Sequence, residues 1–169
     1  MDAICRESLR LYPPATMVFR EAYRDMVLPL SEPIAYDGTA MSKVPIPAGT
    51  MLVLGLGSTN RCKDIWDDAL EFKPEWWLSP LPPTVVESRI PGVYSHTMTL
   101  NGGARSCIGF KISQLEMKVV LTVILSTFKV SFAEETKDVV WKLAAVRYPT
   151  RGQVSNQPEF LLALERLKV

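Results

Sequence analysis

The chain has 169 residues, a net charge of +1, 47% hydrophobic residues and 22% charged residues. This length suffices for one globular domain with a sizeable core. The evenly spread charges argue against a nucleic-acid-binding protein, and no apolar run approaches the roughly 20 residues of a membrane span. The three cysteines lie far apart, which favours a reducing compartment over a disulfide framework or a zinc site.

The first predicted element is an amphipathic helix over residues 2–11, which the prolines at positions 13 and 14 end. Glu7 and Arg10 stand three positions apart in the sequence, so they share one face of this helix. On the residues alone, they predict an exposed ion pair that contributes little to stability.

A strand is predicted over residues 16–23, in which Arg20 has the default interpretation of a solvated side chain. The Asp37-Gly38 pair predicts a β hairpin, and the apolar run 51–56 follows a second turn.

Ser58 and Thr59 predict the cap of a short helix that ends at Cys62. Residues 64–77 are irregular and rich in aromatic side chains, which we interpret as packing this segment down rather than binding a ligand. The proline-rich residues 79–95 predict a loop.

The most informative stretch is LNGGARSCIGF, residues 100–110, which contains three glycines, Arg105 and Cys107. Apolar residues then recur at helical spacing and predict a helix from Cys107 to about Phe128. A helix N-terminus and a neighbouring arginine favour a thiolate, and the glycines let the backbone approach a flat group. Such a thiolate is either a soft metal ligand or a nucleophile.

A cysteine-nucleophile enzyme would need a base near Cys107, and His96 is the one histidine of the chain. The default interpretation of His96 is a structural or solvent-facing side chain. The Cys-x5-Arg spacing of phosphatases is absent, because Ile112 stands five residues after Cys107, and no phosphate-loop Gly-Lys-Ser/Thr occurs. The tail predicts two strands, over residues 139–146 and 160–164, separated by a polar turn.

Four residues of the glycine-rich stretch match the F-x-x-G-x-R-x-C-x-G motif of the cytochrome P-450 monooxygenases, namely Gly103, Arg105, Cys107 and Gly109, with Leu100 where the family usually has phenylalanine. Other family motifs occur in the same order: the E-x-x-R helix at residues 7–10, Leu-Tyr-Pro-Pro at 11–14, Asn-Arg at 60–61 and Phe-Lys-Pro-Glu at 72–75. The chain thus resembles this family over nearly its whole length, as about the last third of a member. Residues 27–50 resemble fungal microsomal members.

The resemblance implies an α+β fold that is mainly α in the parent family. It implies one C-terminal piece of the P-450 domain over residues 1–169, with a haem-ligand loop at about 96–110. The expected order is a short helix, a small β-sheet, a meander, the cysteine loop, a long helix and a C-terminal β hairpin.

The resemblance also implies haem b (iron protoporphyrin IX) as cofactor, with the Cys107 thiolate as the axial ligand of the iron. Arg20 and Arg105 are expected to reach the two haem propionates, which suits the planar, charged guanidinium group. The remaining residues implied in cofactor binding are Gly103, Gly109 and His96, the last as a propionate contact.

In the family, the residues that match Glu7 and Arg10 form a buried pair that braces the haem loop. An arginine usually completes this network, and here Trp76 stands at its position. We therefore expect the pair to lack its third partner unless Arg61 or Arg89 replaces it.

The implied reaction inserts one oxygen atom from O2 into a small lipophilic substrate, with electrons from an NADPH-dependent P-450 reductase. Full-length members of this type reside at the endoplasmic reticulum membrane, on its cytosolic face. Lys111 and Lys118 are either solvated or steer an acidic reductase. Residues 15–19 and the turn at 144–146 resemble substrate-contacting segments.

We expect the oxygen-activating helix, the distal wall and the membrane anchor of the family to lie outside this chain. The chain alone is then expected to carry the proximal site without catalysing the reaction. The alternative is a catalytically inactive haem-binding or vestigial fragment.

Overall fold

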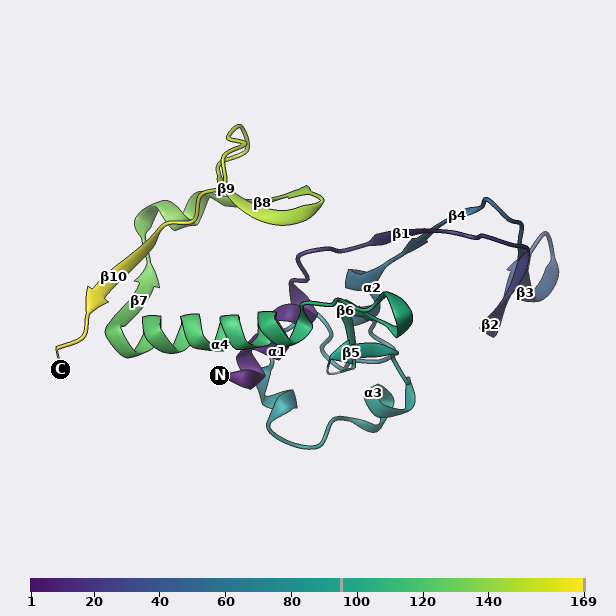
Figure 1. Cartoon of the computed structure of the whole chain (residues 1–169), viewed down its shortest axis with the longest axis horizontal. Helices are drawn as coiled ribbons and strands as arrows, with labels where there is room; N and C mark the ends of the chain where they lie inside the picture. Colours follow the sequence, from purple (N-terminus) through teal and green to yellow (C-terminus); the bar gives the residue numbers. More distant parts are fainter. Residues whose placement is uncertain (95, 169) are drawn as a thin grey trace. The chain divides into compact units, whose positions relative to one another are not determined.

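A computed structural model of the chain describes residues 1–94 and 96–168 (Figure 1). The chain forms two compact units, of which one is Met17–Gly55 and the other combines Met1–Thr16 with Leu56–Val169. Residues 95 and 169 lie outside the described residues. Residue 95 belongs to the loop predicted over 79–95, and both belong to the piece predicted over 1–169.

The smaller unit consists of two antiparallel strand pairs. Strand β1 (Val18–Glu21) pairs with β4 (Met51–Leu54), and β2 (Met26–Tyr36) pairs with β3 (Thr39–Ile46). The turn between β2 and β3 places Asp37 and Gly38 at φ of 49° and 73°, as a two-residue hairpin with right-handed strand twist requires. The predicted hairpin is confirmed, and the predicted strand at 16–23 is present in a shorter form.

The larger unit begins with helix α1 (Asp2–Leu11), as predicted. Helix α2 (Leu56–Asn60) starts two residues before the predicted cap, so Ser58 and Thr59 lie inside it, and that prediction was wrong. The reason is a backbone contact, because the amide N–H of Gly57 donates to the Thr16 carbonyl and satisfies a free donor of the first turn.

The irregular segment after α2 folds around Trp66, whose side chain is fully buried with Ala69 and Val85. The Trp76 and Trp77 rings pack on Trp66 at centroid distances of 5.9 and 5.5 Å. These two residues belong to a 3-10 turn over Pro74–Trp77. The interpretation that the aromatic residues pack this segment down is confirmed for the three tryptophans, whereas Phe72 is 45% exposed.

The predicted loop at 79–95 is in part ordered secondary structure, so that prediction was incomplete. Helix α3 (Pro83–Glu87) begins at a proline, which fits the first helical turn because its N–H would be unpaired there anyway. Strand β5 (Gly92–Tyr94) then pairs with β6 (Thr97–Gly102).

A 3-10 turn over Gly103–Arg105 connects β6 to the cysteine, and helix α4 runs from Phe110 to Thr127. The predicted helix began at Cys107, three residues too early. The amide of Cys107 instead donates to the Leu100 carbonyl over 2.8 Å, which holds the cysteine in the loop. None of the helices in the described residues is long and apolar enough to cross a membrane.

The tail differs from the prediction in its pairing. Strands β8 (Val139–Ala144) and β9 (Val146–Arg151) form the hairpin, with Ala145 at φ 61° in its turn, so part of the predicted polar turn is a strand. Strand β10 (Leu162–Arg166) pairs with β7 (Phe128–Phe132), the strand directly after α4. Which strand pairs with which is decided by tertiary contacts, and the local residue pattern does not indicate it.

Candidate functional site

The Cys107 loop holds the backbone of the cysteine in place and leaves its thiol free. The Cys107 N–H donates to the Leu100 carbonyl over 2.8 Å, and the Cys107 carbonyl accepts from the Phe110 N–H over 3.3 Å. The side chain is half-buried and forms no disulfide. The loop therefore presents a fixed thiol just before the first turn of α4.

Of two motif glycines, Gly109 lies beside this thiol and Gly103 belongs to the 3-10 turn that precedes it. Gly103 has φ +66°, a conformation that side chains rarely adopt, and a Cβ atom built on it meets no atom within 4 Å. A Cβ built on Gly109 lies 3.9 Å from the Cys107 Sγ atom, an ordinary van der Waals distance. A soft sulfur donor beside open space fits a flat metal-bearing cofactor. In the described residues, no group of three or more His, Cys, Asp and Glu side chains gathers to hold a metal ion.

Two further glycines are required for a different reason, and sequence reasoning missed both. A Cβ built on Gly92 would overlap the backbone carbonyl of Thr97, and one built on Gly102 would overlap that of Pro91. These glycines let β5 and β6 approach closely, and β6 leads directly into the cysteine loop. A glycine at a strand position is the signal that points to such close approach.

The Glu7–Arg10 pair is completely buried, with both side chains 0% exposed. Each carboxylate oxygen of Glu7 accepts two hydrogen bonds: Oε1 from Arg10 Nη2 and the Lys73 N–H, both over 2.8 Å, and Oε2 from Arg10 Nε and Trp77 Nε1 over 2.9 and 3.1 Å. The exposed ion pair suggested by the residues alone is therefore wrong, and the burial implied by the family resemblance is confirmed.

The guanidinium of Arg10 uses all five of its N–H donors. Beyond Glu7, it donates to the carbonyls of Asn60, Ala69 and Glu71 at 3.1, 2.7 and 2.9 Å. Its Cζ also lies 5.0 Å from the centroid of the Trp66 ring. Arg10 thereby joins α1 to the end of α2 and to the segment that follows.

The expectation of a missing third partner was wrong, because Trp77 takes this place with its indole N–H. Neither suggested substitute does so: Arg61 Nε donates to the Gly57 carbonyl over 3.0 Å, and Arg89 is exposed. The indole N–H of Trp76, the residue at the family's arginine position, is buried and has no partner among the described residues.

Asn60, another residue that sequence reasoning missed, links this network to the cysteine loop. Its side chain is fully buried; Nδ2 donates to Thr99 Oγ1 over 2.7 Å, and Oδ1 accepts from the Met98 N–H over 2.6 Å. The Thr99 hydroxyl in turn donates to the Leu9 carbonyl of α1 over 2.6 Å. Strand β6 is thus fastened to α1 and α2 from within the core.

The other predicted cofactor residues are distributed over both units. Arg105 is exposed at the end of the 3-10 turn, two residues before Cys107. Arg20 lies on β1 in the smaller unit and donates to the Phe19 carbonyl over 2.8 Å. His96, at φ 51°, lines a cavity together with Arg6 and Lys111. The propionate contacts of these residues remain predictions.

Of the two lysines suggested for partner steering, Lys118 is already engaged. Its ammonium lies 2.5 Å from Asp2 Oδ1, and Arg6 Nε lies 2.6 Å from Asp2 Oδ2. The hydrogen bond from Lys118, helped by Arg6 and opposed by partial burial, holds the pKa of the Asp2 carboxyl below its usual 3.8.

Because this pKa is lowered on folding, the Asp2 carboxylate stabilises the fold above its usual pKa, and the effect disappears as pH falls through the lowered value. We expect Asp2→Asn to reduce the free energy of unfolding by less than about 1 kcal/mol at pH 7, since a side chain 43% exposed is well screened. Urea unfolding should show the difference vanish in acid. Asp67→Asn, at an exposed position, is the control, and an Asp2→Asn effect that persists in acid would contradict this assignment.

The fold is that of the C-terminal part of cytochrome P450 haem domains. The retinoic-acid-bound cyanobacterial CYP120A1 matches with a TM-score of 0.68 and 21% identity, over 98% of this chain and 33% of that chain. The haem domain of a cytochrome P450DA mutant matches with a TM-score of 0.69 and 21% identity, over 99% of this chain and 32% of that chain.

Sequence comparison agrees with the fold. The profile of the family described as "Cytochrome P450" matches residues 1–155, and the chain belongs to the cytochrome P450 family. It is 53% identical to cytochrome P450 monooxygenase 91 of Postia placenta and 50% identical to ganoderic acid synthetase of Ganoderma lucidum, over 99% of this chain in both cases. The chain spans 31% and 30% of the lengths of these fungal relatives. Members of the family are haem monooxygenases that generally use a reductase as redox partner.

Proposed function

We propose that the chain carries the haem-thiolate site of a fungal cytochrome P450 monooxygenase, with Cys107 as the axial ligand of the iron. The observation that supports this most is the free, half-buried Cys107 thiol in a loop whose backbone is fixed on both sides. A thiolate ligand pushes electron density toward the iron, and the bound haem would supply the activation of dioxygen.

In this proposal each residue of the loop has a defined task. Gly103 and Gly109 leave room for the flat cofactor, because a side chain at Gly103 would be strained and none projects there. Arg105 and Arg20 bind the two propionates through their guanidinium groups. Together with the thiolate, these contacts fix the orientation of the cofactor.

The buried Glu7–Arg10 network keeps the loop rigid in this proposal. It holds α1, and the hydrogen bond from Thr99 to the Leu9 carbonyl and the Asn60 side chain pass this restraint to β6. Seven residues, 100–106, separate Thr99 from Cys107, and they include the 3-10 turn. Hydrogen bonds around a metal-ligand loop fix the orientation of the ligand side chain and tune the metal that it binds.

We further propose a small lipophilic substrate and an NADPH-dependent reductase at the cytosolic face of the endoplasmic reticulum. The turn between β8 and β9 supports an apolar substrate, because Leu143 and Val146 flank it and are each 52% exposed. Lys111 is the remaining candidate for reductase steering, since Lys118 is paired with Asp2.

The test is a reduced carbon monoxide difference spectrum of the purified chain after reconstitution with haem. We expect the strongly red-shifted Soret band of a thiolate-ligated haem, and we expect Cys107→Ser to abolish it, because a hydroxyl does not replace a soft thiolate donor. Cys62→Ser is the matched control and should leave the band unchanged, since Cys62 is also a free, half-buried cysteine.

A Soret band at the ordinary position, or loss of the band in Cys62→Ser as well, would contradict the ligand assignment. Failure of the folded chain to take up haem would instead favour the alternative, a vestigial segment with inherited but idle motifs.

A further inference from the structure

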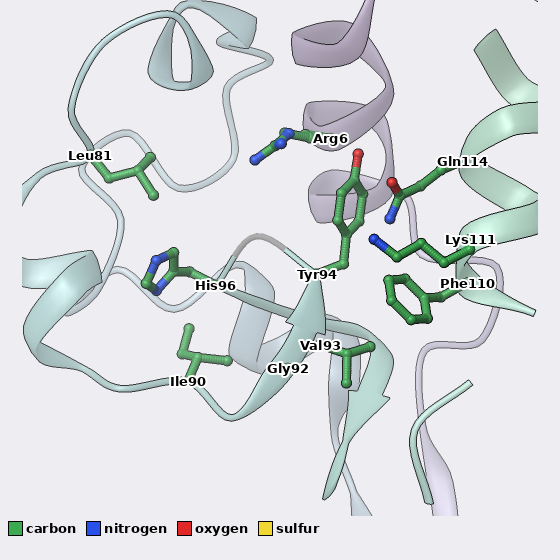
Figure 2. Close-up of a pocket in the computed structure, with 10 residues that line it drawn as sticks. All are labelled: Arg6, Leu81, Ile90, Gly92, Val93, Tyr94, His96, Phe110, Lys111 and Gln114. Carbon is green, nitrogen blue, oxygen red and sulfur yellow. The ribbon is translucent and has the colours of Figure 1, made fainter. Parts of the chain in front are cut away.

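A cavity of about 480 Å³ lies beside the cysteine loop, between α1, the β5–β6 hairpin and the first turn of α4 (Figure 2). Its size is within the usual range of small-ligand sites. Figure 2 shows Phe110, Lys111 and Gln114 projecting from α4 toward Tyr94, while His96 stands with Ile90 and Leu81 toward the other end. The full lining comprises Arg6, Leu81, Ile90, Gly92, Val93, Tyr94, His96, Phe110, Lys111 and Gln114.

The charged groups of this lining are all basic. Arg6 and Lys111 contribute positive charges from two helices, His96 adds an ionisable imidazole, and no carboxylate is among the lining residues. Asp2 lies beside Arg6, but its carboxylate is shared with Lys118, so two cations face one anion there. A positive charge therefore remains in excess at this wall of the cavity.

Among the side chains that the structure describes, no carboxylate lies within ion-pair distance of Lys111, whose ammonium lies 4.9 Å from the centroid of the Phe110 ring. The Arg6 guanidinium is held over the Tyr94 ring at 5.2 Å. Burial raises the pKa of the Tyr94 hydroxyl, so this group stays neutral, and it already donates to Asp2 Oδ1 over 3.5 Å. Cations that are already positioned lose little entropy when an anion binds.

The remaining walls are apolar and aromatic. Leu81, Ile90, Val93 and Phe110 offer hydrocarbon surface beside the basic groups. A free inorganic anion would use only the charges, whereas a ligand with a flat apolar body would also bury this surface. The chemistry of the lining therefore matches an amphipathic organic anion.

We propose that this cavity binds a small organic anion, with its acidic group at Arg6 and Lys111 and its planar body against Phe110, Val93 and Ile90. The proposal does not depend on haem, because neither Cys107 nor Arg105 lines the cavity; it would replace the predicted propionate contact of His96, and it uses Lys111, the residue also proposed to steer a reductase. The ligand would connect α1, the β5–β6 hairpin and the start of α4.

The test is a proton NMR titration of the full chain without haem, with benzenesulfonate as the probe, because its sulfonate stays ionised at neutral pH. His96 is the one histidine, so its ring signal is unique and reports on the cavity directly. We expect a saturable shift of this signal with a dissociation constant of roughly millimolar or tighter. Benzyl alcohol and inorganic sulfate should each bind at least about tenfold more weakly, because the alcohol lacks the anionic group and sulfate lacks the aromatic ring.

Two variants probe the basic wall. Lys111→Gln removes one cation, and Gln114→Glu adds a repelling carboxylate of nearly the same shape; each should weaken benzenesulfonate binding roughly tenfold. Lys129→Gln is the matched control, because this lysine lies on β7, outside the lining, and is 70% exposed. Circular dichroism confirms that each variant keeps the fold.

The proposal is overturned if benzenesulfonate produces no saturable shift or if benzyl alcohol binds equally well. An equal effect of Lys129→Gln would also overturn it, because it would reveal a general charge effect rather than a site. The haem reconstitution experiment measures ligation by Cys107 and not binding in this cavity, so each proposal can fail without the other.

Discussion

Arg10→Met is expected to lower the free energy of unfolding by about 3–5 kcal/mol, because it leaves the Glu7 carboxylate buried without its charged partner. Both side chains are 0% exposed, and the arginine satisfies three carbonyl groups besides the carboxylate. Methionine keeps most of the side-chain volume, so the loss reports on charge and hydrogen bonds rather than on a cavity. Urea unfolding followed by far-ultraviolet circular dichroism measures the change.

Arg61→Met is the matched control for this substitution. The side chain of Arg61 is partly buried, but its Nε donates to only one carbonyl group, that of Gly57. Its removal should cost about 1 kcal/mol. If the two variants lost equal stability, the buried network would not be the principal brace of this region.

Gly102→Ala should be the most damaging substitution in the cysteine loop, with a loss of about 3 kcal/mol or more in the free energy of unfolding. The added Cβ would overlap the carbonyl of Pro91, a backbone atom that can move only if β5 moves with it. We expect the β5–β6 pairing to open at Gly92, where Gly102 is the register partner. Hydrogen exchange of the β6 amides measures this opening.

Gly109→Ala is the informative comparison, because Gly109 belongs to the family motif and Gly102 does not. A Cβ at Gly109 would lie 3.9 Å from the Cys107 Sγ atom, and the backbone there has φ −85°, which alanine adopts readily. Its effect on stability should be within about 1 kcal/mol. A result in which Gly109→Ala is the more damaging of the two would show that the close approach of β5 and β6 is not the limiting constraint.

Elements with a strong local pattern were predictable from the sequence. Helix α1 has an amphipathic repeat and a following proline pair, and the β2–β3 turn has the Asp37-Gly38 dipeptide that its geometry requires. The start of α4 was missed by three residues because a hydrogen bond to Leu100, and not the helical repeat, decides where Cys107 belongs. The pairing of β10 with β7 was missed because it joins strands about 30 residues apart with no local signal.

In the candidate site, too, only the features encoded by neighbouring residues were predictable. Cys107 could be named as a candidate ligand because its spacing from Arg105 and the glycines lies within a few consecutive residues, and its role stays a prediction. The roles of Asn60 and Trp77 could not be identified, because each depends on contacts with residues 39 and 70 positions away. The expectation that Trp76 leaves Glu7 and Arg10 without a third partner was wrong for the same reason. In the folded segment, the neighbouring Trp77 supplies the donor.

The hydrogen-bond acceptors of Arg10 determine which positions around it can change in sequence. Three of its five hydrogen bonds end on main-chain carbonyl groups, at Asn60, Ala69 and Glu71, and every residue type provides a carbonyl. The exposed position 71 can therefore change identity without loss of its bond, provided that the backbone keeps its course, whereas Ala69 is restricted by its burial against Trp66. Substitutions in this part of the chain are restricted at buried side chains such as Glu7, Arg10 and Asn60 and tolerated at exposed positions such as Glu71.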